Sequence, residues 1–266
     1  MKTHPVARLA RLAAAILQLL LLLLPLLLPL SSRAAGMPLH LATLEWPPFV
    51  GANLPDQGLS AFIVSTVGKR AGLETKISYY PWARALQVGA TDPSYAGSFP
   101  AYSNSEREKS CYLSHDIGQS VLGFAHLKST AFDWKTLDEL KGMRIGVVHG
   151  YSNGELFDRM VHEEQLQTDT APNDVTNLHK LLAKRIPVIV IDRDVLRYLL
   201  QVEPSLKDAK NTIVFHPQPI NQLSLHICFQ RSRQGQALRQ RFDAALKKTN
   251  LRALEKTYFE KQALAE

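Results

Sequence analysis

Residues 150–154 bring together, at one tight turn, residue types that could do chemistry. Their letters, Gly-Tyr-Ser-Asn-Gly, fit the G-x-S-x-G pattern in which a serine between a strand and a helix acts as a nucleophile. A turn of the same kind aims the free backbone N–H groups of a helix N-terminus at an anion. The segment therefore supports two different functions, hydrolysis through Ser152 or binding of an anionic group.

The hydrolase interpretation finds partial support in residue order. Acids (Asp192, Asp194) and histidines (His216, His226) follow Ser152 in the order found in α/β-hydrolases. However, no HGG-like oxyanion segment lies upstream, only a few strands precede the turn, and His226 falls inside a predicted strand. Because short patterns of this kind often match by chance, the sequence favours anion binding.

Charge and histidine spacing predict neither a metal site nor nucleic-acid binding. The remaining histidines show no metal-ligand spacing, although His149 adjoins the turn, and neither cysteine belongs to a C-x-x-C pair. The chain carries 31 basic and 24 acidic residues, a balance of +7. Residues 1–36 hold four basic and no acidic residues, so the remainder has 27 basic and 24 acidic residues, a balance of +3. Without a Lys/Arg stripe interleaved with exposed aromatics, nucleic-acid binding is not expected, and no cofactor is predicted.

Residues 1–36 have the layout of a cleavable secretory signal peptide. Basic residues precede an apolar stretch at 13–30, and small residues follow it. Cleavage after Ala34 or after Gly36 satisfies the small-residue rule. The alternative is a retained anchor, because an apolar run of about 18 residues can just span a bilayer. Two prolines in the run and the small-residue end favour removal, so we expect a periplasmic protein.

Cys111 and Cys228 are the two cysteines of the chain. In an oxidising compartment they could pair. A bridge requires Cα atoms within about 7 Å, which the sequence does not specify. Two buried free thiols are the alternative, so both possibilities stay open.

The remaining residues alternate between predicted strands and helices. Apolar periodicity predicts strands near 39–44, 75–80, 95–99, 143–148 and 186–191, and helices near 59–67, 82–88, 155–160, 175–185 and twice at the C-terminal end. This alternation indicates parallel α/β sheets, and the pattern restarts near residue 143, which suggests two similar lobes. In such sheets ligands bind beyond the carboxyl ends of the strands. The residues that fall there are Trp46, Tyr80, residues 98–102, residues 151–153 and Asp192.

Four segments in a fixed order carry a family resemblance: 41–51 (LATLEWPPFVG), 80–86 (YPWARAL), 105–108 (SERE) and 144–154 (RIGVVHGYSNG). Together they are similar to the bacterial extracellular solute-binding proteins of family 3, the periplasmic amino-acid receptors of uptake transporters. The likeness covers most of residues 38–250.

The resemblance implies an α/β, two-lobed periplasmic-binding-protein fold of type II. Each lobe would be a mostly parallel sheet flanked by helices, with two crossing hinge segments, expected at 121–127 and 223–229. Lobe 1 would comprise residues 37–120 and 222–266, and lobe 2 residues 121–221.

The resemblance also implies roles for particular residues of lobe 1. Trp46 matches an aromatic residue that stacks on the ligand. Arg107 matches the arginine that grips the ligand carboxylate, which suits its planar fork of donors. The alternative for Arg107 is a surface side chain paired with Glu106 or Glu108. Further pocket aromatics, each of which could instead be a core residue, are expected at Phe49, Tyr80, Trp82, Phe99 and Tyr102; Arg84, on the Trp82 helix, could equally be exposed.

In lobe 2 the resemblance implies a donor loop and an acid. The loop residues Tyr151, Ser152 and Asn153 would give hydroxyl and backbone donors to the ligand carboxylate. Asp192 would pair with a ligand amino group, and its alternative role is the N-cap of the following helix.

The chain departs from the family pattern at several positions. Pro187 stands where the family usually has Asp, and Ser114-His115-Asp116 replaces a Ser-x-Pro segment. Pro100 and Tyr102 stand where amino-acid receptors tend to carry small hydroxyl residues. These changes weaken the inference about the ligand more than the inference about the fold.

The sequence therefore predicts an exported, monomeric receptor that captures a small polar solute, an amino acid or a related organic acid or amine, for a transporter. No catalytic residue is predicted. The main alternative is an enzyme on the same scaffold, similar to a cyclohexadienyl dehydratase. That reaction needs a positioned general acid, for which Glu45 and Asp192 are the candidates.

Overall fold

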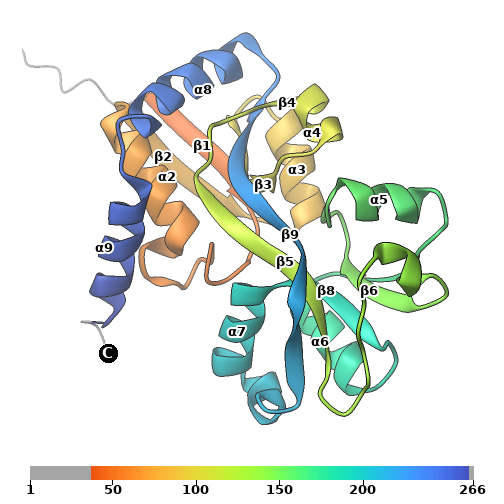
Figure 1. Cartoon of the computed structure of the whole chain (residues 1–266). Helices are drawn as coiled ribbons and strands as arrows, with labels where there is room; N and C mark the ends of the chain where they lie inside the picture. The colour runs from red at the N-terminus through yellow and green to blue at the C-terminus, as the bar shows by residue number, and fades with distance from the viewer. Residues whose placement is uncertain (1–36, 264–266) are drawn as a thin grey trace, which may run out of the picture. The chain divides into compact units, whose positions relative to one another are not determined.

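The computed structural model describes residues 37–263, in which strands and helices alternate along the chain (Figure 1). The predicted signal peptide lies outside the described residues. The strands are β1 (Met37–Thr43), β2 (Leu73–Tyr79), β3 (Gly97–Tyr102), β4 (Cys111–Leu113), β5 (Gly118–Leu127), β6 (Arg144–Val148), β7 (Gln167–Ala171), β8 (Val188–Asp192) and β9 (Ile213–Gln230). The α-helices are α2 (Leu59–Arg70), α3 (Trp82–Thr91), α4 (Ser105–Ser110), α5 (Glu155–His162), α6 (Asp174–Leu182), α7 (Arg193–Val202), α8 (Arg233–Leu246) and α9 (Leu251–Ala263), and short 3-10 helices are η2 (Pro55–Gln57), η3 (Leu137–Leu140) and η4 (Pro204–Ala209).

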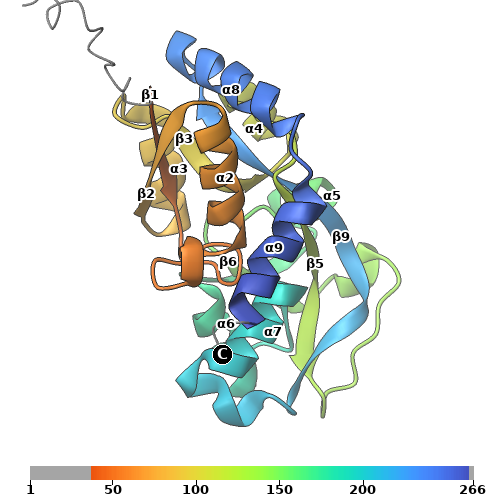
Figure 2. The ribbon, with the colours of Figure 1, turned by 90° about the vertical axis from the view of Figure 1, so that its left-hand side faces the viewer.

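The strands of the described residues form one continuous sheet in the order β2-β1-β3-β9-β5-β8-β6-β7, with β4 paired to β9. Strand β1 is parallel to β2 and β3, and β6 is parallel to β7 and β8. Strands β5 and β9 are antiparallel and join these two parallel groups (Figure 2). The predicted α/β fold with two parallel groups and two crossing segments is therefore confirmed. The two groups share one sheet because β5 and β9 remain paired as they cross.

The crossing strands change register where they pass from one group to the other. Leu122 pairs with Asn221, whereas Gly123 pairs with Pro219. A proline has no N–H to donate to the ladder, so regular pairing cannot continue through it. Gly123 is required here because a Cβ atom at this position would lie 2.4 Å from the Phe215 ring.

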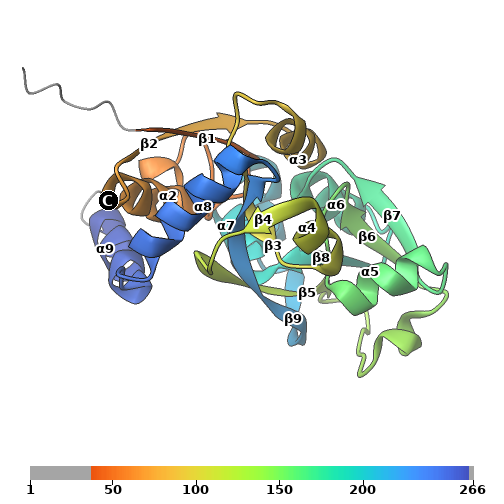
Figure 3. The ribbon, with the colours of Figure 1, turned by 90° about the horizontal axis from the view of Figure 1, so that it is seen from above.

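Hydrophobic side chains fill the space between the sheet and its helices. Lobe 1 below means residues 37–120 and 222–266, and lobe 2 means residues 121–221, as the sequence predicts. In lobe 1, α2 packs on β2 and lies beside α8 and α9 (Figures 2 and 3), over the fully buried Leu39 and Leu41. In lobe 2, a second cluster around Phe124, Ile145 and Phe157 packs α5 against β5 and β6.

Within residues 37–263, no helix is long and apolar enough to cross a membrane. The same part of the chain holds no group of three or more His, Cys, Asp or Glu side chains arranged to bind a metal ion.

Candidate functional site

The turn between β6 and α5 lies against helix α3 of the other lobe. Gly150 has φ +78°, a conformation that favours glycine. A Cβ atom at Gly150 would lie 3.3 Å from the Cβ of Ala83 in α3. The glycine therefore serves both the tight turn and the close approach of the two lobes.

The donors of this turn bind a carboxylate of the chain itself. The Ser152 hydroxyl donates to Oδ2 of Asp158 at 2.5 Å, and the Asn153 N–H donates to Oδ1 at 2.8 Å. The N-cap of α5 is Gly154, which has no side chain to accept from the first N–H groups, and Asp158 folds back from the helix toward the turn. Burial raises the pKa of Asp158, while its hydrogen bonds from Ser152 and Asn153 and the nearby Arg107 act in the opposite direction.

Arg107 is buried, with 8% of its surface exposed. Its Nη1 donates to the backbone oxygen of Tyr102 at 3.0 Å, and its guanidinium lies over the Trp82 ring at 5.8 Å. Burial lowers the pKa of Arg107, and the negative charge of Asp158 opposes that shift. Among residues 37–263, no carboxylate forms an ion pair with Arg107 within 4.0 Å, so the alternative of a surface arginine paired with a neighbouring glutamate is wrong.

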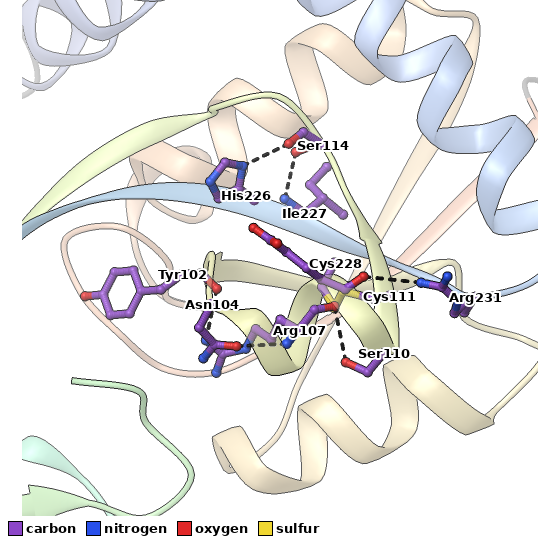
Figure 4. The surroundings of a disulfide bond; sticks show 11 residues. Tyr102, Asn104, Arg107, Ser110, Cys111, Ser114, His226, Ile227, Cys228 and Arg231 are labelled. Carbon is purple, nitrogen blue, oxygen red and sulfur yellow. Dashed lines mark hydrogen bonds between the residues drawn. A yellow bond between two sulfur atoms is a disulfide. The ribbon is translucent and has the colours of Figure 1, made fainter. Parts of the chain in front are cut away.

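Asn104 connects the arginine of lobe 1 with the turn of lobe 2. Its side-chain oxygen accepts from the Arg107 N–H at 2.8 Å and so caps α4 (Figure 4). Its amide nitrogen donates to the Ser152 hydroxyl oxygen at 3.1 Å. Sequence reasoning missed Asn104. Its position before a helix is typical of an N-cap, but no local signal indicates the contact with the other lobe.

The partners of Ser152 contradict the hydrolase interpretation. Its hydroxyl contacts a carboxylate and an amide, and within the described residues it has no histidine hydrogen-bond partner. His226 Nδ1 lies 2.9 Å from the Ser114 backbone oxygen, and His216 Nε2 lies 3.2 Å from Asp133. Neither His216 nor His226 is therefore placed to remove a proton from Ser152.

Asp192 lies at the carboxyl end of β8 and is almost fully buried. Its Oδ1 accepts from the N–H groups of Asp194 and Val195 at 2.7 and 2.9 Å, so it is the N-cap of α7. Its Oδ2 accepts from the Ser120 hydroxyl, which lies 2.7 Å from the hydroxyl of Tyr102. Burial raises the pKa of Asp192 despite these hydrogen bonds.

Asp174 is a second buried carboxyl group, at the start of α6. The Tyr151 hydroxyl donates to its Oδ2 at 3.4 Å. Burial, and next the charge of Asp192, raise the pKa of Asp174 to about 7. Sequence reasoning missed this residue because an acid in the first turn of a helix is ordinary. Asp174 and Asp192 are thus two buried acids of lobe 2; neither lines a cavity, but the Tyr151 hydroxyl connects Asp174 to the wall of the inner one.

Two cavities adjoin these residues. The inner cavity, of about 20 Å³, is lined by Trp46, Trp82, Tyr102, Arg107 and the turn of lobe 2. The outer cavity, of about 660 Å³, lies between α3 and α4 on one side and β6, β7 and α5 on the other. The inner volume suits about one water molecule, whereas the outer volume is in the usual range for small-molecule pockets. A solute as large as an amino acid can enter the inner cavity only if side chains or lobes move apart.

Six of the residues predicted for the site line the inner cavity together: Trp46, Trp82, Tyr102, Arg107, Tyr151 and Ser152. Asn153 lines the outer cavity, as do Arg107, Tyr151 and Ser152. Asp192 lines neither cavity, but the Ser120 hydroxyl connects it to Tyr102 at the wall of the inner one. The structure therefore brings most of the predicted residues to one place.

Three predicted pocket aromatics do not line either cavity. Phe49 is buried behind Trp46, with ring centroids 4.5 Å apart. Phe99 is fully buried in the core, because it points to the face of β3 opposite Ser98. The Tyr80 hydroxyl lies 2.7 Å from that of Tyr95, and neither tyrosine lines a cavity.

Two further charged candidates also lie away from the cavities. Glu45 is exposed and accepts from the Ala52 N–H, so it is not placed to act as a general acid. Arg84 is exposed and donates to Gln87 at 2.9 Å, in agreement with its exposed-face alternative.

The two cysteines form a disulfide at the wall of the outer cavity. Cys111 in β4 and Cys228 in β9 have Cα atoms 5.5 Å apart. Cys111 directly follows α4, the helix that carries Arg107 (Figure 4). The bridge therefore ties that helix to the crossing strand β9.

No protein-family model and no curated protein matches this chain. Solved structures do match it. The GluR0 ligand-binding core from Nostoc punctiforme in complex with L-glutamate is 20% identical over 84% of this chain and 99% of its own, with a TM-score of 0.65. An ancestral arginine-binding protein bound to arginine is 14% identical over 85% and 98%, with a TM-score of 0.68. An ancestral amino-acid-binding protein, a precursor of cyclohexadienyl dehydratase, is 16% identical over 84% and 94%, with a TM-score of 0.63. At these identities the matches show the fold, which is that of the periplasmic binding proteins.

Proposed function

We propose that this protein is an exported receptor of the family 3 type that binds a small zwitterionic solute between its two lobes. The observation that carries the proposal is a buried arginine at the wall of an aromatic-lined cavity, whose other wall residues Tyr102 and Tyr151 are hydrogen-bonded, through Ser120 and directly, to buried acids. Arg107 is buried in lobe 1, and Asp174 and Asp192 are buried in lobe 2. The solved structures of the same fold include proteins that bind glutamate and arginine, which supports an amino acid or a related compound as the solute.

The energetics of buried charge favour this assignment. A buried cation without a charged partner is costly, and Arg107 donates only to a neutral carbonyl oxygen in addition to its contact with Trp82. A solute carboxylate would supply the missing partner through charge-assisted hydrogen bonds, each worth about 1.5–3 kcal/mol. The amino group of the same solute would face the wall of the inner cavity, where the hydroxyls of Tyr102 and Tyr151 connect to the buried carboxyl groups of Asp192 and Asp174.

We include in the proposal that the protein is exported to the periplasm and delivers its solute to a transporter, and three features support this. The first 36 residues have the composition of a signal peptide. The Cys111–Cys228 disulfide suits an oxidising compartment. The fold is one in which the solute is enclosed between lobes, so a membrane partner could recognise the closed form of a monomeric receptor.

The test is a ligand screen of the exported protein. Native mass spectrometry would first look for a solute that co-purifies, and thermal shift would then be measured with amino acids, small peptides and organic amines. A solute at 100 times its dissociation constant adds about 2.7 kcal/mol of stability. Arg107→Ala should abolish the shift. Arg84→Ala, which removes an exposed arginine from α3, is the matched control and should keep it. A shift that survives Arg107→Ala would refute the site.

The second candidate is a dehydratase on the same scaffold, favoured by one observation. Asp174 has a pKa of about 7 because of burial and the charge of Asp192, which is suitable for a general acid at neutral pH. The ancestral precursor of cyclohexadienyl dehydratase has the same fold. Incubation with prephenate-like acids tests this candidate: product formation that Asp174→Asn abolishes would replace the receptor proposal.

A further inference from the structure

The donors of the turn at residues 151–154 are already bound to an anion, the carboxylate of Asp158. Both of its oxygens accept hydrogen bonds there, one from the Ser152 hydroxyl and one from the Asn153 N–H. Asp158 also lines the outer cavity together with Arg107 and the exposed Glu106. The wall of lobe 2 therefore presents a negative charge at the place where the resemblance predicts donors for a solute carboxylate.

We infer that Asp158 is the specificity-determining residue of this receptor, because its carboxylate fills the anion position of the turn. The inference rests on the proposed function. A solute carboxylate would then be bound by Arg107 without the turn. The part of the solute that faces the turn would be cationic or rich in N–H groups, so that it pairs with Asp158.

Three neighbours hold Asp158 in this position. Asn104 donates to the Ser152 hydroxyl oxygen at 3.1 Å, which leaves the hydroxyl proton directed at Asp158. Gly154, the N-cap of α5, offers no competing acceptor. The buried guanidinium of Arg107 favours a negative charge nearby. The same donors and the same cation would attract a small external anion if Asp158 were removed.

The experiment uses acetate as a minimal carboxylate probe, with the full exported chain. Thermal unfolding is followed at increasing acetate concentration and constant ionic strength for the wild type, Asp158→Ala, Asp158→Asn and Glu155→Ala. Glu155 is an exposed acid in the first turn of the same helix, so its removal changes the charge of α5 without freeing the turn. Asp158→Asn removes the charge but keeps a side chain of the same shape in the turn.

Acetate should bind to Asp158→Ala at least tenfold more tightly than to the wild type, and Asp158→Asn and Glu155→Ala should behave like the wild type. Equal acetate affinities of the wild type and Asp158→Ala would overturn the inference. An equal gain of acetate affinity in Asp158→Asn and Asp158→Ala would also overturn it, because it would indicate that Asp158 acts through charge repulsion alone. If the alanine variant does not fold, Asp158→Ser, which is also too short to reach the turn, takes its place. The acetate assay needs no natural solute, so its result is independent of the ligand screen. A negative acetate result with an Arg107-dependent ligand shift refutes only the role of Asp158, and a positive acetate result without a ligand shift refutes only the proposed function.

Discussion

The pKa of Asp174 makes a quantitative prediction about stability, to be tested with Asp174→Asn. Asparagine keeps the size of the side chain and its ability to accept from the Tyr151 hydroxyl, but it cannot ionise. Burial and the charge of Asp192 raise the pKa of Asp174 from 3.8 to about 7 in the folded protein. In the unfolded chain the carboxyl group returns to its ordinary pKa.

The sign and size of the effect follow from proton linkage. Between the two pKa values the folded state holds a proton that the unfolded state has released, so the free energy of unfolding falls as pH rises. Above pH 7 both states are ionised and the penalty is constant, at about 4 kcal/mol. Between pH 5 and pH 8 the wild type should therefore lose about 2.5 kcal/mol through this one group.

The assay is urea unfolding of the wild type and Asp174→Asn at pH 5 and at pH 8. The variant should be more stable relative to the wild type at pH 8 than at pH 5, by about 2.5 kcal/mol. Asp208→Asn, which changes an exposed acid of lobe 2, should show a pH-independent difference near zero. A difference between Asp174→Asn and the wild type that stays the same at both pH values would refute the buried, protonated state of Asp174.

Two further predictions concern the framework of the site. Replacing Cys111 and Cys228 by alanine opens a loop with a sequence separation of 117. The free energy of unfolding, measured in urea, should fall by about 2–5 kcal/mol. An unchanged urea midpoint would show that the bridge does not stabilise the fold. Gly150→Ala should lower the free energy of unfolding by more than the roughly 1–2 kcal/mol needed to hold alanine in a left-handed conformation, because the added Cβ also contacts Ala83. Gly142→Ala is the control, because Gly142 has φ +80° and a Cβ atom there would have no atom within 4 Å, so this variant measures the backbone cost alone. Equal losses of unfolding free energy in the two variants would contradict the contact between the lobes.

The sequence predicts the apolar elements of the fold well and the polar ones poorly. Strand β6 is a short apolar run that is buried on both faces, and helix α2 buries apolar residues at helical spacing, so both can be predicted from hydrophobicity. Strand β7 has the sequence QTDTA, without an apolar alternation, and it lies at the edge of the sheet. Strand β9 runs from Ile213 to Gln230 and is far longer than the predicted segment 223–229. Its first half is not predicted because Pro217, Pro219 and the polar residues between 217 and 222 are untypical of a strand.

Within the site, the position of a residue along a strand indicates which part of the fold it lies in, but not to which face of the sheet its side chain points. Phe99 and Pro100 are adjacent in β3, yet only Pro100 lines the inner cavity, because successive side chains point to opposite faces. The burial of Arg107 is equally hidden. Its segment, SEREKS, has the composition of an exposed helix, whereas in the fold the Arg107 side chain is buried, lies over the Trp82 ring and donates to the backbone of Tyr102.

The turn at residues 150–154 shows where local sequence stops being informative. Its geometry follows from the two glycines, which allow positive φ at both ends. Which group its donors bind depends on Asp158, one turn into α5. In a capping box an acid at the third helical position reaches back to the N-cap N–H. Here the N-cap is glycine, the acid comes one position later, and its oxygens reach Ser152 and Asn153 instead. The donors of the turn thus bind the chain's own carboxylate because the acid lies one position beyond the capping-box position, and this arrangement is local enough to test by substitution at residue 158.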